Sequence, residues 1–386
     1  MRRLECMDGL RGVLAVYVMI GHMAPFAPLP TWLAHPLSHG GATVDMFFIL
    51  SGLVITGSLE AFRYRARPFL IARAARIFPV FLVVFLAAIL VQTVPHGFDL
   101  MPWLPPDSPG RLFWSEGLPR HWPVDVAAHV TMTHGLFPAG TLPDVWVSIL
   151  GASWSLSTEW QFYVLALLLA AWLAARGEVT LRLAWLLIAL GTAGVAWDWL
   201  APPSWQFSRA FIGNKAAYFG LGVISTVVVR SGGRAWRGYA VALAATLALI
   251  VGHAALGQAD LGHGSVGKLL PPMAWTLCLA AQVAPGTVTG LSWLAALLRC
   301  RWAQVLGAWS YGIYLVNEPV QELFGVALAR FSGGHSGLFT LFWLPGAIVL
   351  PIAAAALLHR WIEVPGQQWG RSLIARRRVT TAGAPA

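Results

Sequence analysis

The chain has 386 residues, of which 57% are hydrophobic and 11% charged, whereas soluble proteins carry about 25% charged residues. A soluble protein of this size needs far more polar side chains to cover its surface, so the composition indicates an integral membrane protein. The 20 tryptophans fit the aromatic belts of membrane–water interfaces. Three scattered cysteines exclude a disulfide framework or a zinc knuckle.

The apolar segments predict an all-α fold, because a transmembrane helix needs about 20 mostly apolar residues. Ten segments meet this requirement, near residues 9–27, 41–59, 77–95, 154–175, 181–200, 210–229, 238–256, 269–285, 303–328 and 339–361. The stretch 285–302 leaves room for a further short or re-entrant segment. We expect one transmembrane domain over 1–371, with a long extracytoplasmic connection at 96–150, and a basic, disordered cytoplasmic tail at 372–386.

The net charge of +10 would suggest a nucleic-acid partner in a soluble protein. Here, however, the positions of the basic residues along the chain indicate which loops lie on the cytoplasmic side of a membrane. Lys and Arg in short loops mark the cytoplasmic side. Arginines gather in every second connection, the first connection (28–40) has neither Lys nor Arg, and 96–150 carries more acidic than basic residues. This alternation predicts cytoplasmic termini in a multi-pass protein of the bacterial inner membrane, without nucleic acid.

Arg11 and His22 lie within the first apolar segment, where ionisable groups mark candidate sites. At about 100° and 1.5 Å per residue they share a helix face and lie roughly 16 Å apart. This separation is close to the length of a pantetheine arm, so Arg11 could hold phosphates while His22 meets a thioester. The alternative is that Arg11 reaches toward lipid headgroups and His22 is a structural histidine.

Further charged groups stand at the starts of later segments. Arg73 and Arg76 share a face and form either a phosphate clamp or ordinary cytoplasmic charge. Glu159 would orient His22 or act as a base, or else serve as counter-ion to an arginine such as Arg209.

Two histidines of the long connection, His129 and His134, are five residues apart. This spacing does not place them on one helix face as metal ligands. We expect them to be solvated or to contact an acceptor, and we expect no metal.

The segment 8-DGLRGVLAVYVMIGH-22 resembles the opening of the acyltransferase-3 family of integral membrane acyltransferases, in which an Arg is followed by ten residues and a His. Other family segments have counterparts in order: GATVDMFFILSG from 41, FLIARAARIFP from 69, SWSLSTEWQFY from 153, WSYGIYLVNEP from 309 and WIEVPG from 361. The resemblance covers residues 4 to 371.

The resemblance implies transfer of an acyl group, typically acetyl from cytoplasmic acetyl-CoA, to a hydroxyl of an extracytoplasmic glycan such as O-antigen or exopolysaccharide. His22 would be catalytic, assisted by Glu159. The donor would be bound by Arg11, Arg73 and Arg76. Candidate acceptor contacts are Tyr311, Trp154 and Asn317, the last at a position where many relatives carry a His.

Some relatives carry an extracytoplasmic esterase-like domain that has no counterpart here, so a separate extracytoplasmic partner is expected if the final step needs one. The alternative functions are a transporter or flippase of an anionic or sugar substrate, and a non-catalytic partner in glycan assembly. The sequence does not indicate an oligomeric state.

Overall fold

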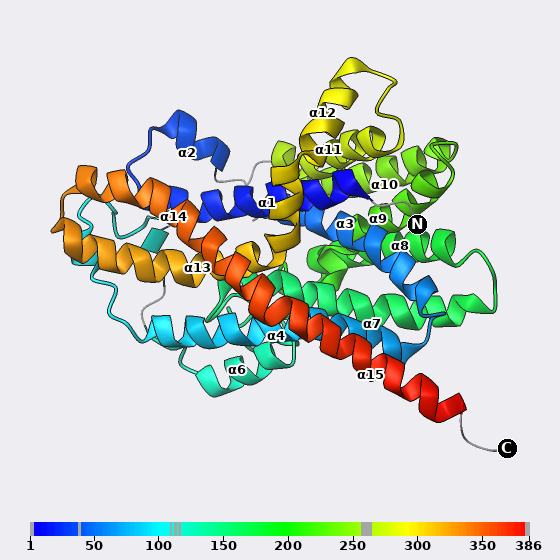
Figure 1. Ribbon diagram of the computed structural model, residues 1–386, viewed down its shortest axis with the longest axis horizontal. Coiled ribbons are helices and arrows are strands. Elements are labelled where there is room, and N and C mark those ends of the chain that lie inside the picture. Colours follow the sequence, from blue (N-terminus) through cyan, green and yellow to red (C-terminus); the bar gives the residue numbers. More distant parts are fainter. Residues whose placement is uncertain are drawn as a thin grey trace.

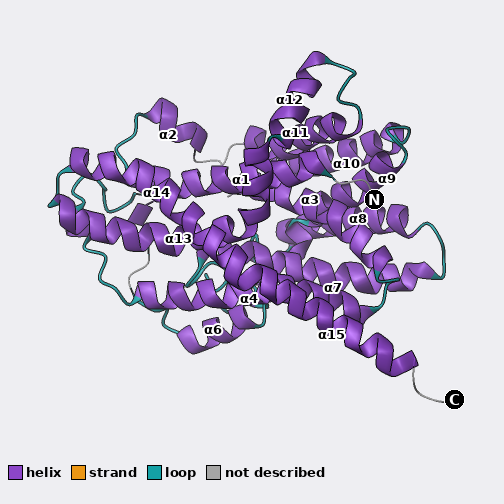
Figure 2. Ribbon diagram, in the orientation of Figure 1, coloured by secondary structure: helices purple, strands orange, loops and turns teal. Residues whose placement is uncertain are grey.

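The computed structural model describes residues 4–37, 40–108, 110–111, 114, 117–255 and 265–382. Within these ranges the chain is helical and contains no β-strand, apart from one isolated bridge between Pro138 and Phe207 (Figure 2). The predicted all-α class is confirmed.

Every one of the apolar segments lies on a helix. In chain order these helices are α1 (Glu5–Met23), α3 (Gly40–Ala61), α4 (Ala66–Gln92), α7 (Trp154–Ala174), α8 (Val179–Leu200), α9 (Ala216–Arg230), α10 (Trp236–Ala255), α11 (Ser265–Val283), α13 (Arg301–Ser332) and α14 (Ser336–Leu358). The shorter helices are α2 (Thr31–Leu37), α6 (Trp122–Val130) and α12 (Thr289–Arg299). Single 3-10 turns are η1 (Ala24–Phe26), η2 (Phe98–Leu100), η3 (His134–Leu136), η4 (Gly151–Ser153), η5 (Pro203–Trp205) and η6 (Ile212–Asn214).

Seven helical segments of the described chain are long and apolar enough to cross a membrane, namely those of α1, α3, α4, α7, α8, α10 and α14. The chain is therefore an integral membrane protein. Helix α9 is apolar but has only 15 residues. Helix α13 is long enough, yet it carries Glu318 and, among its buried residues, Asn317 and Glu322. The count of ten spans therefore remains a prediction.

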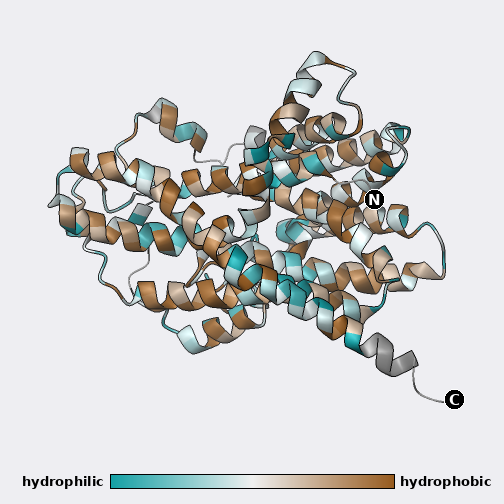
Figure 3. Cartoon of the chain, in the orientation of Figure 1, coloured by the Kyte–Doolittle hydropathy of each residue, from teal (hydrophilic) through white to brown (hydrophobic). Residues whose placement is uncertain are grey.

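Two segments near the C-terminus form helices in addition to those on the ten expected spans. Helix α12 occupies the 285–302 stretch in which a further short segment was expected. After α14, a π-helical turn, η7 (His359–Glu363), leads into α15 (Val364–Ala382). This helix includes residues 372–382, which the sequence analysis had placed in a disordered tail, and 383–386 lie outside the described residues. Figure 3 shows that hydrophilic residues gather along α15, in contrast to the apolar helices around it.

Glycines allow close packing between helices that are distant in sequence. A Cβ on Gly12 of α1 would lie 2.5 Å from the backbone nitrogen of Gly307 on α13. Likewise, a Cβ on Gly222 of α9 would collide with the carbonyl of Ile49 on α3. Small residues at such crossings let helix backbones approach closely in membranes. The α1–α13 contact, visible in Figure 1, brings the last turn of α1 to the middle of α13.

The first turn of α1 and the last turn of α15 point toward the same end of the molecule (Figure 1). The connection between α13 and α14 lies at the opposite end, beyond the last turns of α4. This arrangement is compatible with both termini on one side of a membrane.

Candidate active site

His22, in the last turn of α1, is held by Asn317 of α13. The Nδ1 atom of His22 lies 2.7 Å from Oδ1 of Asn317. The Asn317 amide nitrogen donates to the carbonyls of Ile313 (2.9 Å) and Tyr314 (2.7 Å), which fixes the orientation of the amide. Because the amide oxygen can only accept, Nδ1 of a neutral His22 carries the proton and Nε2 carries the lone pair. This is the tautomer that a base or nucleophile requires at Nε2.

Glu318, the next residue of α13, links this pair to the start of α7. Its two carboxylate oxygens accept hydrogen bonds from the backbone N–H groups of Gly151 and Ala152, each at 3.0 Å. It also has an attractive electrostatic interaction with His22. The sequence analysis gave Glu318 no role, although a carboxylate inside an apolar segment was a signal that could have singled it out.

The three arginines predicted to bind the donor lie together. Arg11 of α1 and Arg73 and Arg76 of α4 line one narrow cavity of about 90 Å³. Arg73 donates to Ser58 Oγ at 3.2 Å, while its Nε atom is buried with no hydrogen-bond partner among the described residues. A buried donor in this state is an expected partner for a ligand oxygen.

Glu159 of α7 belongs to the arginine group. Its Oε1 atom accepts hydrogen bonds from Ser51 (2.8 Å) and Tyr163, and it interacts electrostatically with Arg11, Arg73 and Arg76. The alternative of a counter-ion is favoured, but the suggested partner Arg209 is wrong. The guanidinium of Arg209 lies instead over the ring of Trp146, 5.3 Å from its centroid.

A second cavity, of about 250 Å³, adjoins the first. Both are lined by Arg11, Arg76, Ser310 and Tyr311. The outer part of the second cavity is polar and is lined by Asp8, Gln304, His359, Glu363 and Gln367. Together the two cavities lead into the bundle from the end at which α1 begins, and the inner, narrow cavity is lined mainly by apolar side chains around the arginines.

The inner end of this route reaches the helix turn that supports the histidine. Tyr314 lines the narrow cavity, and its hydroxyl hydrogen-bonds to Ser155 Oγ at 2.9 Å. The carbonyl of Tyr314 also accepts from Asn317, which holds His22. The narrow cavity therefore reaches from the arginines to Tyr314, about one turn before Asn317 on α13, and His22 itself lines neither cavity.

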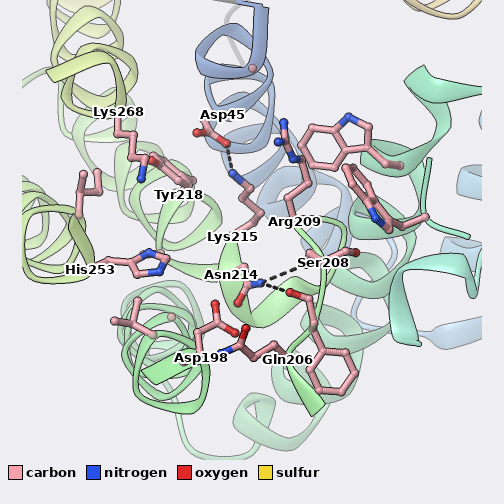
Figure 4. Close-up of a pocket in the computed structure, with 18 of the residues that line it drawn as sticks. Asp45, Asp198, Gln206, Ser208, Arg209, Asn214, Lys215, Tyr218, His253 and Lys268 are labelled. Atoms are coloured by element: carbon pink, nitrogen blue, oxygen red, sulfur yellow. Dashed lines mark hydrogen bonds and ion pairs between the residues drawn. The ribbon is translucent and has the colours of Figure 1, made fainter. Parts of the chain in front are cut away.

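Two residues predicted to contact the acceptor occupy different places. Tyr311 donates to the carbonyl of Ile77 at 2.7 Å and lines both small cavities, so it lies on the route with the arginines. Trp154 lines a larger pocket, of about 470 Å³ (Figure 4). Its ring packs edge-on against Phe48, whose side chain also lines the narrow cavity. The Phe48–Trp154 contact thus lies between the large pocket and the narrow cavity.

His129 and His134 of the long connection have a structural role. Their rings stack with centroids 4.1 Å apart, and both side chains are fully buried. Burial is the main reason that the pKa of His129 falls to about 3 and that of His134 to about 4. The expectation that they are solvated or contact an acceptor is wrong. The described residues contain no cluster of side chains suited to a metal ion.

A bundle of membrane helices that holds an arginine-lined cavity and, one turn beyond its inner end, an oriented histidine fits an integral membrane enzyme. The profile of the acyltransferase-3 family, described as an acyltransferase domain, matches residues 4–360. The chain belongs to this family and is an acyltransferase.

The chain is also similar to the acyltransferase MdmB of Streptomyces mycarofaciens, with 28% identity over the whole of this chain and 96% of the relative. No solved structure matches it.

Proposed function

We propose that this protein transfers an acetyl group from cytoplasmic acetyl-CoA to a hydroxyl of an extracytoplasmic glycan. Membership of the family gives acyl transfer; the donor, the acceptor and the bacterial inner membrane are our proposal. The observation that carries it is the narrow cavity lined by Arg11, Arg73 and Arg76, which reaches Tyr314, about one turn from the Asn317 that holds His22.

The arginines suit the phosphates of coenzyme A. A guanidinium matches phosphate oxygens with two parallel hydrogen bonds, and here three of them surround a single carboxylate, Glu159. The narrow cavity beyond them fits a thin chain such as pantetheine better than a nucleotide. Because α1 is helical from Glu5 to Met23, the rise from Arg11 to His22 is about 16 Å, which the pantetheine arm spans.

His22 would then carry the chemistry through Nε2. In direct transfer, Nε2 takes the proton of the acceptor hydroxyl as the oxygen attacks the thioester carbon, and the departing thiolate of coenzyme A takes that proton. In a relay, Nε2 attacks the thioester carbon and expels the thiolate of coenzyme A; the acceptor hydroxyl then attacks the acyl-histidine, the bond to Nε2 breaks, and the thiolate takes the hydroxyl proton. Glu318 supports both routes, because its negative charge stabilises the positive charge that develops on His22.

In the proposed topology, ten spans place both termini in the cytoplasm and the 96–150 connection outside. Arg63, Arg65, Arg67, Arg73 and Arg76 then mark the cytoplasmic face, at the end where α1 begins. Membership of an acyltransferase family favours transfer over transport. A separate extracytoplasmic protein would complete the reaction if the acceptor does not reach His22 unaided.

The experiment is mass spectrometry of surface glycans from cells that carry the wild-type chain, a His22→Ala variant or no copy. We expect one acetyl increment with the wild type and none with the other two. His121→Ala, which removes an exposed histidine of the long connection, is the matched control and should retain the increment. Normal acetylation by a well-expressed His22→Ala variant would refute both routes, and unchanged glycans in all strains would favour transport.

A further inference from the structure

The pocket of about 470 Å³ lined by Trp154 lies apart from the proposed route of the donor. It is formed by the first turns of α3 and α11, the last turns of α8 and α10, and the segments that precede α7 and α9 (Figure 4). In the proposed topology all of these ends face the extracytoplasmic side. The pocket therefore opens where an acceptor would arrive.

The distribution of lysines singles this pocket out. Lys and Arg total 26 in the chain, but only two are lysines, Lys215 and Lys268, and both line the pocket. Lys215 forms an ion pair with Asp45 at 2.7 Å, with both side chains largely buried. This pair is electrically balanced within the protein.

Lys268 is not balanced in this way. It is 9% exposed, and its Nζ atom has no hydrogen-bond partner among the residues that the structure describes. Figure 4 shows it on the wall of the pocket above His253. A buried ammonium group without a partner is costly by several kcal/mol, and an anionic group of a ligand would remove this penalty.

The opposite part of the pocket offers acceptors for hydroxyl groups. Asp198 has a buried Oδ1 atom without a hydrogen-bond partner among the described residues. Figure 4 places Asp198 and Gln206 together, below His253. A carboxylate oxygen is a strong acceptor for sugar hydroxyls.

Arg209 adds a second cation that faces the pocket. Its guanidinium lies 5.3 Å from the ring centroid of Trp146 and 6.0 Å from that of Trp154. The two rings hold the guanidinium in place by cation–π contact. Trp154 thus positions Arg209, rather than presenting an open ring face on which a sugar could stack.

We propose that this pocket binds the acceptor and that the acceptor is an acidic sugar unit. Its carboxylate or phosphate pairs with Lys268 and its hydroxyls bond to Asp198. The inference rests on the proposed function, since it names the class of acceptor for the same transfer.

Binding can be tested without catalysis, because the chain has two lysines only. Protein labelled with [ε-¹³C]lysine in phosphatidylcholine nanodiscs should give two lysine signals, and Lys268→Arg assigns them. We expect glucuronate and glucose 6-phosphate to shift the Lys268 signal, while glucose leaves it unchanged. A shift with phosphatidylglycerol alone would make the site a lipid-headgroup site. Equal shifts with glucose, or no shift with any probe, would also overturn the proposal.

Activity provides the second arm, with methyl glucuronide and methyl glucoside as paired acceptors. Lys268→Gln removes a charge-assisted hydrogen bond to the sugar acid. It should therefore raise KM for the glucuronide about 10- to 100-fold and leave KM for the glucoside unchanged. Arg120→Gln, which removes an exposed arginine of the 96–150 connection, is the control and should change neither.

The two hypotheses fail in different ways. Equal losses for both acceptors in Lys268→Gln would refute the acidic acceptor, while the His22→Ala result would still support acyl transfer. If the wild type acylates neither acceptor but the sugar acids shift the Lys268 signal, the result supports binding of an acidic sugar in the pocket and refutes acyl transfer to a sugar.

Discussion

The side chain of Asn317 determines which nitrogen of His22 carries its proton. Its amide nitrogen is engaged by the carbonyls of Ile313 and Tyr314, so its oxygen faces Nδ1 of His22 at 2.7 Å. An asparagine at this position therefore orients the imidazole instead of taking part in proton transfer. We propose that Asn317 positions His22, whereas the sequence analysis expected it to contact the acceptor.

Replacing Asn317 with Leu should lower kcat about 100-fold, because Nδ1 loses its acceptor and the productive tautomer is no longer selected. KM for acetyl-CoA should stay within about 3-fold, since the arginine group is untouched. The measurement is the transfer rate of the purified protein in nanodiscs.

Gln321→Leu is the matched control for this variant. Gln321 lies one turn further along α13 and donates to the carbonyls of Met19 and Ala347. It is buried like Asn317 but makes no hydrogen bond to His22. This variant should lose stability and keep its kcat; an equal loss of kcat in both variants would show that the effect of Asn317 is only structural.

Substitution of the arginine group should weaken binding of the donor selectively. Arg76→Gln removes a proposed partner of the coenzyme A phosphates and should raise KM for acetyl-CoA about 10- to 100-fold, with KM for the acceptor unchanged. The same variant should lose the thermal stabilisation that coenzyme A alone gives the wild type. Arg182→Gln, at an exposed position of α8, should behave as wild type, and unaltered donor binding in Arg76→Gln would contradict the proposed route.

A single methyl group at Gly151 should disturb the support of the histidine. A Cβ there would lie 2.9 Å from Oε1 of Glu318. This contact is too close, so the carboxylate would have to move away from the backbone N–H groups of Gly151 and Ala152 to which it is hydrogen-bonded. Gly151→Ala should therefore reduce kcat about 10-fold, a cost of about 1.4 kcal/mol in the transition state. Gly252→Ala on α10, where a Cβ meets open space, is the control, and full activity in Gly151→Ala would remove Glu318 from the mechanism.

The stacked histidines predict sensitivity to acid. The pKa values of His129 (about 3) and His134 (about 4) in the folded protein lie below the unfolded value of about 6.5. The unfolded state therefore binds more protons, so the stability from these neutral rings is complete above about pH 6.5 and is lost as pH falls toward 4. Each ring should contribute a loss of about 2 kcal/mol at pH 5.

His129→Phe tests this dependence, since it keeps an aromatic ring in the stack and removes one titrating group. Its Tm should fall less than that of the wild type between pH 7 and pH 5, even if it starts lower. His335→Gln, at an exposed position, should follow the wild-type curve. Parallel curves for His129→Phe and the wild type would show that other groups control the acid response.

The sequence predicted the helices well, because apolar segments of membrane length leave the backbone few alternatives in lipid. The proximity of Arg11 to Arg73 and Arg76 was also predictable, since charged groups inside membrane spans tend to gather around one internal cavity. The boundary at residue 371 was not, because π-helical turn η7 (His359–Glu363) carries the chain from α14 directly into α15.

Contacts between distant segments could not be predicted in the same way. The His22–Asn317 bond joins residues 295 positions apart and depends on the close crossing of α1 and α13 at Gly12 and Gly307. The unbalanced charge on Lys268 is visible only in three dimensions. A signal for it was nevertheless present in the sequence, where two lysines stand among 26 basic residues.

The aromatic contact between Phe48 and Trp154 has a consequence for the cell as well as for catalysis. In the proposed topology it stands between a cavity reached from the cytoplasm and a pocket open to the exterior. A continuous column of water between these spaces would conduct protons and dissipate the membrane potential. If that topology holds, the two packed rings would block such a column of water at the boundary between the two spaces.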